Sequence, residues 1–252
     1  MSEEVKATWR KYICANRKDE AVGVASYYFY PEDGGELPAY LPGQHVQLRA
    51  SLSGKAFGPH EYVISQAPGG ALLRLTVKHY AGSDEIPSGI ALYRGLQIGS
   101  AVELSAPFGS YTFDPKEMHP VVMIGAGIGI AQLLPLLEML ATVNPVRDLH
   151  LLYSVQNSAA FALRSDVLGL FEGLHSFGKA IFYTHPLESD VIGRDYDAQG
   201  RISPERIRSF CQNPDADFWI CGPADFVDMV KQALLSIGII APRLHCEVTT
   251  AD

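Results

Sequence analysis

A glycine-rich segment near the middle of the chain constrains the fold more than any other feature. Gly125, Gly127 and Gly129 follow the apolar run Val121–Ile124 and precede the apolar stretch Leu133–Leu140. This order is typical of a strand, a tight turn and a helix in an open α/β sheet, where the helix N-terminus presents free N–H groups to an anion. The segment therefore predicts a nucleotide-phosphate site, with an ordinary strand-to-helix connection as the alternative.

Residues 5–113, before this turn, have the pattern of short strands. His45–Arg49 and Leu73–Lys78 alternate polar and apolar residues, the period of a half-buried strand, and Ala101–Leu104 repeats it. Turn residues such as Pro68–Gly70 separate these runs. Several short strands at close spacing favour a small antiparallel β-barrel.

From Pro120 onward the pattern changes to strands that alternate with helices. The strand candidates are 121–124, 149–154, 180–184 and 217–221, and the helical stretches are 131–142, 159–174, 204–212 and 224–237. This alternation predicts βαβ units on a doubly wound parallel sheet. With a linker over 111–119, we predict a barrel domain over residues 1–115 and a nucleotide-binding α/β domain over 116–252.

The composition limits the partners and the location of the protein. The formal charge of −8 argues against nucleic acid or an anionic membrane surface as the main partner, because both require a basic surface. No apolar run is long enough to span a membrane. The polar start Met1–Glu4 shows no secretory signal, so we expect a cytoplasmic protein. The sequence leaves the oligomeric state open.

The four cysteines do not form a metal-binding or disulfide pattern. Cys14, Cys211, Cys221 and Cys246 are scattered and contain no Cys-x-x-Cys pair. They therefore predict neither a disulfide framework nor a zinc or iron–sulfur site.

The second strand candidate of the α/β half lacks a charged residue at its end. The common dehydrogenase motif carries an acidic residue roughly 20 positions after the glycines, where it holds the adenosine ribose. Here Leu149–Ser154 is followed by Val155–Asn157, with neither a carboxylate nor a basic residue for a 2′-phosphate. We therefore favour NADH mildly over NADPH. The next basic residue, Arg164, is expected to be a solvated charge.

A second ligand-binding signal follows the last apolar strand candidate. Phe218–Ile220 leads into Cys221, Gly222 and Pro223, and a helical stretch begins directly after them. In a doubly wound sheet, ligands bind beyond the carboxyl ends of the strands. Gly222 would let a ring approach the backbone, and Pro223 would fix the turn. Cys221 is either a neighbour of a nicotinamide ring or a small buried apolar residue.

Together, these residues resemble the ferredoxin–NADP reductase superfamily, and most closely the reductase module of flavohemoglobins. The similar segments are 41–45, 60–65, 76–78, 98–104, 106–109, 125–129, 200–202, 221–223 and 245–248. The resemblance implies a six-stranded antiparallel Greek-key barrel that binds FAD, followed by an NAD(P)H-binding α/β domain. It also implies an enzyme that passes a hydride from nicotinamide to FAD.

The flavin-binding segment differs from the family pattern. An Arg-x-Tyr-Ser segment holds the flavin in the family, and the corresponding residues here are His60, Tyr62 and Val63. Tyr62 is expected to pack on the flavin ring. His60 lacks the permanent charge and planar fork with which arginine holds a phosphate. Val63 has no side-chain donor, which leaves only its backbone N–H to face the flavin.

Further residues are expected to contact the flavin because of the same resemblance. Ser65, Thr76 and Lys78 lie in the similar segments. Ser88 retains the serine of a second flavin motif whose glycine is replaced by Glu85, and it caps a short helix either against the pyrophosphate or without a ligand.

The resemblance also defines the expected reaction and its alternative. Cys221 is expected to lie beside the nicotinamide, and Glu247 is expected either to assist proton movement or to make a structural hydrogen bond. Because no globin domain or plant-type iron–sulfur motif is found, electrons are expected to pass to a separate protein, free flavin, small molecule or oxygen. The altered flavin motif leaves one alternative, a flavin-less nucleotide-binding or regulatory module with the same fold.

Overall fold

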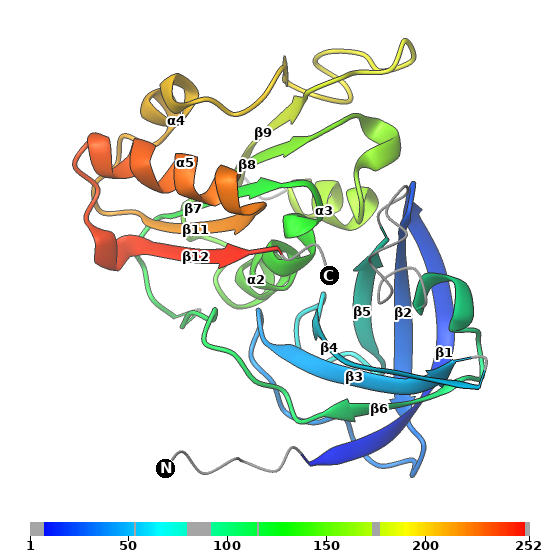
Figure 1. Cartoon of the computed structure of the whole chain (residues 1–252). Helices are drawn as coiled ribbons and strands as arrows, with labels where there is room; N and C mark the ends of the chain where they lie inside the picture. The colour runs from blue at the N-terminus through cyan, green and yellow to red at the C-terminus, as the bar shows by residue number, and fades with distance from the viewer. Residues whose placement is uncertain (1–7, 53, 80–91, 115, 173–176, 250–252) are drawn as a thin grey trace. The chain divides into compact units, whose positions relative to one another are not determined.

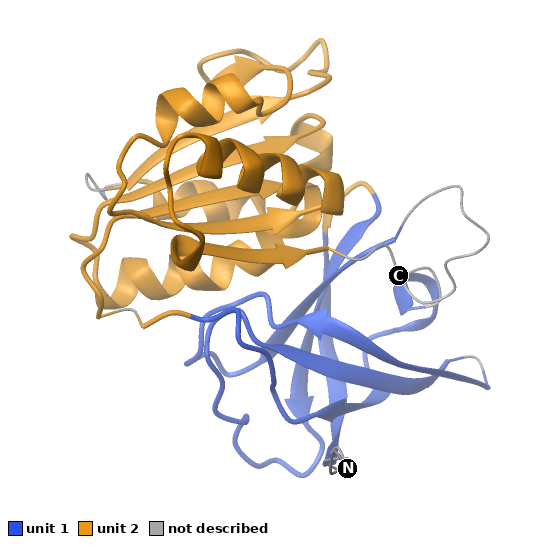
Figure 2. Cartoon of the chain, turned by 60° about the vertical axis from the view of Figure 1, so that its left-hand side comes forward, with its two compact units in different colours: residues 1–19, 23–112, 251–252 blue, residues 20–22, 113–250 orange. Residues whose placement is uncertain are grey.

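The computed structural model describes residues 8–52, 54–79, 92–114, 116–172 and 177–249. These residues form two compact units (Figure 2). The first contains Gly23–Thr112 and the chain up to Asp19, and the second contains Glu20–Val22 and Phe113–Thr250. Each unit has its own sheet and its own core.

The first unit is built on a six-stranded antiparallel sheet that curls into a barrel (Figure 1). Its strands are β1 (Trp9–Ala21), β2 (Val24–Pro31), β3 (His45–Leu52), β4 (Lys55–Val63), β5 (Leu73–Lys78) and β6 (Ala101–Ser105). They lie in the order β4-β3-β6-β1-β2-β5. Ile64, directly after β4, bridges to Leu75 of β5, so the two edge strands meet.

Alternating side chains explain why these strands close around a core. In β3, Val46 and Leu48 are buried, whereas His45, Gln47 and Arg49 beside them are half-exposed. The same alternation in β6 buries Val102 and Leu104. Because successive side chains of a strand point to opposite faces, one face of each strand fills the barrel interior. Tyr27 of β2 also lies in this apolar cluster and is fully buried.

The second unit contains a six-stranded sheet in which every pairing is parallel. Its strands are β7 (Val121–Ala126), β8 (Leu149–Val155), β9 (Phe177–Tyr183), β10 (Ala198–Gln199), β11 (Asp217–Gly222) and β12 (Leu244–Val248). Its helices are α2 (Ile130–Val143), α3 (Arg164–Leu170), α4 (Pro204–Phe210) and α5 (Ala224–Ser236). The strand order is β10-β9-β8-β7-β11-β12.

Helices cover both faces of this parallel sheet (Figure 1). α4 and α5 pack together and bury apolar residues such as Ile207 and Val230 against one face. α2 and α3 pack together on the other face. The predicted fold class, an antiparallel β-barrel followed by a doubly wound α/β unit, is therefore confirmed.

The strand order places a switch point beside the glycine turn. The chain runs outward from β7 to β8, β9 and β10, and then returns to β11 on the other side of β7. Ligands of such sheets bind beyond the carboxyl ends of the strands at this reversal. The carboxyl ends of β7 and β11 are therefore the expected nucleotide site of this fold.

One predicted helix is shorter than the sequence pattern indicates. The helical pattern covers 159–174, but α3 spans only Arg164–Leu170. Asn157 accepts a hydrogen bond from Ala160 N in a short 3₁₀ turn, and Leu163 then has a left-handed backbone with φ of 57°. A leucine in this conformation interrupts a right-handed helix. The apolar period continues through the interruption, and the sequence therefore gives no sign of it.

No helix in the described part of the chain is long and apolar enough to cross a membrane. The described residues also contain no group of His, Cys, Asp and Glu side chains arranged to hold a metal ion.

Candidate functional site

The glycine turn joins β7 to α2 through a single 3₁₀ turn, η1 (Gly127–Gly129). Gly127 has a φ of +55°, a left-handed conformation that residues other than glycine rarely adopt. A Cβ atom at Gly127 would meet nothing within 4 Å, so this part of the turn faces open space. The turn therefore leaves its backbone accessible to a ligand.

The two other glycines of the turn are required by close packing. A Cβ atom on Gly125 would lie 2.8 Å from Leu133 Cδ1, which is closer than real Cβ atoms approach their neighbours. At Gly129 a Cβ atom would collide with the backbone carbonyl of Cys221. The turn thus brings the start of α2 directly against the end of β11.

The helical segment that starts with η1 and continues as α2 is suited to a phosphate at its start in the glycine turn. The first N–H group of α2 itself, that of Ile130, donates to Gly127 O. Among the described residues, no side chain caps this helix, and its first turn contains no acidic residue. The first N–H groups of a helix have no partner inside the helix, and they carry a partial positive charge. An open glycine turn that leads into such a helix fits the pyrophosphate of a dinucleotide.

Tyr153 of the neighbouring strand β8 fixes the glycine turn by a hydrogen bond, a role that the sequence does not predict. Its hydroxyl donates a hydrogen bond of 2.7 Å to Gly127 O, and its ring packs on Phe161. The side chain is fully buried, and burial raises its pKa well above the ordinary value, so the phenol stays a neutral donor. Its register opposite Gly125 is the only signal that could have indicated this contact.

We expect the substitution Tyr153→Phe to raise the KM for NADH with little change in kcat. The free energy of unfolding is expected to fall by about 1 kcal/mol, because one buried hydrogen bond is lost and Gly127 O is left without it. Steady-state kinetics and thermal unfolding measure the two effects.

Tyr183→Phe is a matched control for this prediction. Tyr183 of β9 is equally buried, and among the described residues its hydroxyl faces the charge of Arg164 and makes no hydrogen bond to the glycine turn. An equal rise in KM for both variants would contradict the role assigned to Tyr153.

Cys221, Gly222 and Pro223 lie at the end of β11, beside the glycine turn. Cys221 pairs in register with Gly125 of β7, and its thiol is fully buried. Burial raises the pKa of Cys221 strongly, and the charge of Glu247 adds to this effect, so the thiol is protonated at neutral pH. Cys221 is therefore a neutral apolar group and not a nucleophile.

Gly222 also has a packing reason to be glycine. A Cβ atom there would lie 2.7 Å from Phe226 Cδ1 and 3.2 Å from Ala126 Cβ. Pro223 follows as the N-cap residue of α5 and is exposed. The absence of a side chain thus keeps the two strand ends close together.

β12 brings Glu247 to the same edge of the sheet. Glu247 is half-buried and pairs in register with Cys221. Thr249 N then donates a hydrogen bond of 2.9 Å to Gly222 O. The fold therefore brings together all the residues predicted on the nucleotide side, namely Gly125, Gly127, Gly129, Cys221, Gly222, Pro223 and Glu247.

In the first unit, β4 carries the three residues of the altered flavin segment. Tyr62 is half-buried, lies in register with Val46 and packs against the barrel core. His60 lies two positions earlier, so both side chains are on one face of the strand. The His60 ring contacts Phe57, with 4.9 Å between ring centroids. Val63 pairs with His45 and is also half-buried.

Ser65 and Thr76 belong to a chain of buried hydroxyl groups. The Thr76 hydroxyl lies 2.7 Å from that of Ser65 and 2.9 Å from that of Ser26. All three residues are buried, and Ser65 also donates to Arg74 O. These hydroxyls connect β2, β5 and the end of β4 on the sheet face opposite the barrel core, because their neighbours Tyr27, Leu75 and Ile64 are the residues that fill that core.

Lys78 lies at the end of β5 and is half-buried, and burial lowers its pKa. Ser88 lies outside the described residues. The first unit thus offers an aromatic side chain, an imidazole and a lysine. Tyr62 fits an aromatic ring system, while His60 provides a weaker phosphate partner than the family's arginine.

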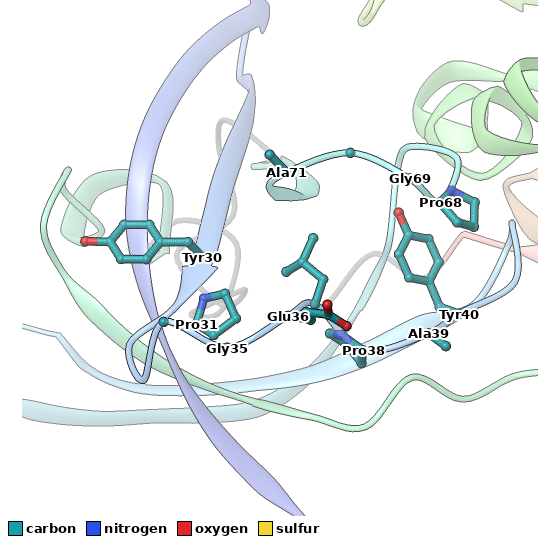
Figure 3. A pocket seen from close by; sticks show the side chains of 13 residues that line it. Tyr30, Pro31, Gly35, Glu36, Pro38, Ala39, Tyr40, Pro68, Gly69 and Ala71 are labelled. Carbon is teal, nitrogen blue, oxygen red and sulfur yellow. The ribbon is translucent and has the colours of Figure 1, made fainter.

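A pocket of about 650 Å³ opens elsewhere in the first unit (Figure 3). Tyr30 and Tyr40 lie at its two ends, and the segment Pro68–Ala71 forms one side. The Tyr40 hydroxyl donates to Ala67 O at 3.0 Å and fixes this end. Glu36 is the only charged residue among the described lining residues, so the pocket offers no cation to a phosphate.

Comparisons with known proteins agree with this arrangement. Residues 123–232 match the family described as the oxidoreductase NAD-binding domain. The chain is 31% identical over 245 residues to a flavohemoprotein of Bordetella pertussis and 32% identical over 244 residues to one of Chromobacterium violaceum. Each alignment covers 95% of this chain and 60% of the relative, so the chain spans about three fifths of these proteins.

Solved structures show the same two-unit fold. The FAD/NAD-binding domain of a nitric oxide dioxygenase from Vibrio cholerae superposes with a TM-score of 0.82 at 26% identity, over 95% of this chain and 98% of that one. The cytochrome b5 reductase-like region of a human protein, solved in its NAD⁺ form, gives a TM-score of 0.82 at 20% identity. That superposition covers 97% of this chain and 70% of the human one.

Proposed function

We propose that the chain is a flavin-dependent NAD(P)H oxidoreductase of the ferredoxin–NADP reductase superfamily, to which its sequence and fold are similar. It takes a hydride from the nicotinamide to FAD and passes electrons to a separate acceptor. The observation that carries this proposal is the open glycine turn at the switch point, with Gly127 left-handed and α2 uncapped among the described residues.

The chain's own residues bind and orient the substrate. The backbone N–H groups of the Gly125–Gly129 turn hold the pyrophosphate at the start of the helical segment, because Ile130 N already donates to Gly127 O, and Tyr153 fixes the turn. The backbone at Cys221 and Gly222 faces the nicotinamide, while the protonated Cys221 thiol adds no charge there. Glu247, half-buried at the next strand, holds or moves a proton. No nucleophile is required.

Tyr62 and Lys78 are the residues that would hold the flavin, with His60 toward its phosphates. When bound, the flavin supplies the redox chemistry, because it accepts two electrons and a proton from a nicotinamide and releases electrons to an acceptor. The barrel's part is to position the ring, and the hydroxyls of Ser65 and Thr76 join the end of β4 to β5.

The acceptor is proposed as a separate species, and the relatives indicate its range. The Bordetella relative is a flavohemoprotein, and one fold neighbour, a phthalate dioxygenase reductase, transfers electrons from pyridine nucleotides to a [2Fe–2S] centre. Oxidation of NADH by the FAD-loaded protein, with ferricyanide, cytochrome c, free flavin or oxygen supplied in turn, tests the proposal. Absence of NADH and NADPH oxidation with every acceptor would contradict it.

We expect His60→Arg to tighten FAD binding. An arginine at this position of β4 would restore a permanent charge and a planar fork for a phosphate. A hydrogen bond to a charged group contributes about 1.5–3 kcal/mol, so the dissociation constant of FAD is expected to fall about 10- to 100-fold. Titration of the apoprotein with FAD, followed by flavin fluorescence, measures this constant.

Ala56→Arg is the matched control for His60→Arg. Ala56 is an exposed residue of the same strand, and its replacement adds the same charge four positions away. If both variants tightened FAD binding equally, general electrostatics would explain the effect and the position assigned to His60 would be wrong.

A further inference from the structure

A carboxylate lies at the end of β8, although residues 149–157, which form this strand and the turn after it, contain none. It belongs to Asp190, in the segment that follows β9, and Ser158 follows β8. Ser158 Oγ donates to Asp190 Oδ1 at 2.5 Å, and Ser158 N donates to Oδ2 at 3.4 Å. Leu187 N donates a further hydrogen bond to Oδ2 at 2.9 Å. The fold thus supplies an acidic group to the second strand from 32 residues further along the chain.

Asp190 is charged and keeps the capacity to accept another hydrogen bond. Burial raises its pKa, but the hydrogen bonds from Ser158 and Leu187 outweigh burial, and the pKa is lowered overall. The side chain is half-buried. Each carboxylate oxygen accepts about two hydrogen bonds, and Oδ1 receives one in the contacts described above. A ligand hydroxyl can therefore donate to Oδ1.

Two cations near this segment are already paired. Asp195 binds Arg164 at 2.9 Å and Arg194 at 2.7 Å, and it also accepts from Val191 N. Each guanidinium is therefore partly engaged by the Asp195 carboxylate. The charged group that contacts Ser158 at the end of β8 is the carboxylate of Asp190.

The sheet order places this carboxylate on the adenosine side of the nucleotide. The pyrophosphate site follows β7, and the nicotinamide site follows β11 on one side of it. β8 is the neighbour of β7 on the opposite side, with Ser154 in register with Ala126. In doubly wound nucleotide-binding sheets, an acidic residue at the end of the second strand accepts from the ribose 2′-hydroxyl.

We propose that Asp190 binds the adenosine ribose of NADH and disfavours the 2′-phosphate of NADPH. The inference rests on the proposed function and specifies its substrate as NADH. Ser158 is the positioning residue, because it holds the carboxylate at the end of β8. A 2′-hydroxyl donates the second hydrogen bond that Asp190 Oδ1 can accept. A 2′-phosphate instead brings further negative charge close to the carboxylate, which repels it.

The test measures binding of two fragments that lack nicotinamide. ADP-ribose and 2′-phospho-ADP-ribose are titrated into the wild-type chain and into Asp190→Asn by calorimetry. We expect the wild type to prefer ADP-ribose, and the isosteric variant to lose about tenfold or more of that preference, because the charged acceptor is removed. Ser158→Ala is expected to shift the preference in the same direction by a smaller factor.

Glu188→Gln is the matched control, since Glu188 is an exposed carboxylate two positions away in the same segment. It is expected to leave both affinities unchanged. The proposal is overturned if the wild type binds the 2′-phosphorylated fragment better, or if Asp190→Asn retains the wild-type preference while thermal unfolding shows that it is folded.

A third compound, which is a substrate and not a binding fragment, separates this inference from the proposed function. Reduced nicotinamide mononucleotide contains no adenosine, so its oxidation by the FAD-loaded protein is expected to be equal in the wild type and Asp190→Asn. If the wild type oxidises neither this compound nor NADH, the proposed reductase activity fails, while the fragment titrations still decide the role of Asp190. If oxidation proceeds but the fragment preference does not change, only the role of Asp190 is lost.

Discussion

Replacement of Gly127 by valine is expected to abolish NADH binding, with at least a hundredfold loss in kcat/KM. Gly127 has a φ of +55°, which a β-branched residue adopts only with strain of about 1–3 kcal/mol. The new side chain would also occupy the open space in front of the turn, where the pyrophosphate is expected. Calorimetric titration with NADH measures the loss directly, without turnover.

Gly238→Val separates the loss of the phosphate site from simple backbone strain. Gly238 follows α5 and has a φ of +90°, and a Cβ atom added there would meet nothing within 4 Å. This variant therefore introduces a similar strain in the same unit but away from the turn. We expect it to bind NADH normally, and normal binding by the Gly127 variant would show that the phosphate site lies elsewhere.

Gly129→Ala is expected to destabilise the second unit and to weaken NADH binding together. The added methyl group would collide with the carbonyl of Cys221, and backbone atoms cannot move aside as a flexible side chain can. Overpacking in a well-packed interior costs about 1–3 kcal/mol, so the free energy of unfolding should fall by at least this amount. Thermal unfolding and NADH titration measure the two effects.

Gly169→Ala is the control for this substitution. Gly169 lies in α3 with open space around it, and alanine favours a helix more than glycine does. We expect an equal or slightly higher melting temperature for the Gly169 variant. If Gly129→Ala were equally stable, the close approach between the turn and β11 would be wrong.

The nucleotide half could be predicted from the sequence because several local signals agree. An apolar run, three glycines and an apolar helical stretch lie in succession around Gly125–Gly129, and each signal favours the same strand–turn–helix unit. The end of β11 could be predicted equally well, because Cys221 and Gly222 follow a continuous apolar strand. Those contacts depend on residues that are close in sequence, so local patterns reveal them.

The first strand could not be recognised in the same way. β1 spans Trp9–Ala21, but Tyr12 and Cys14 are its only buried residues, and the charged residues elsewhere in the strand hide the alternation. It is held by pairing with β6, from Trp9 opposite Ser105 to Ile13 opposite Ala101. Pairing between strands far apart in sequence leaves no local pattern, so only a general β signal is visible there.

The residues that hold the candidate site in place could not be predicted from the sequence either. Tyr153 contacts Gly127 only because β7 and β8 are neighbours in the sheet. Asp190, which follows β9, hydrogen-bonds to Ser158, which follows β8, because these two strands are also neighbours. Ser65 and Thr76 are predicted to contact the flavin, and the hydrogen bond that joins their hydroxyls on the face opposite the barrel core depends on the meeting of the two edge strands β4 and β5. The flavin contacts and the domain boundary at residues 115/116 stay predictions, although the two compact units divide near it, after Thr112.

Reduction of the bound flavin by NADH tests the central claim most directly. The FAD-loaded protein is mixed with NADH without oxygen, and the absorption of the oxidised flavin is followed in time. We predict rapid bleaching at a rate that saturates with NADH concentration and falls when the transferred hydrogen of NADH is deuterium. A protein that binds FAD and NADH but leaves the flavin oxidised would contradict the account, as would a chain that does not retain added FAD.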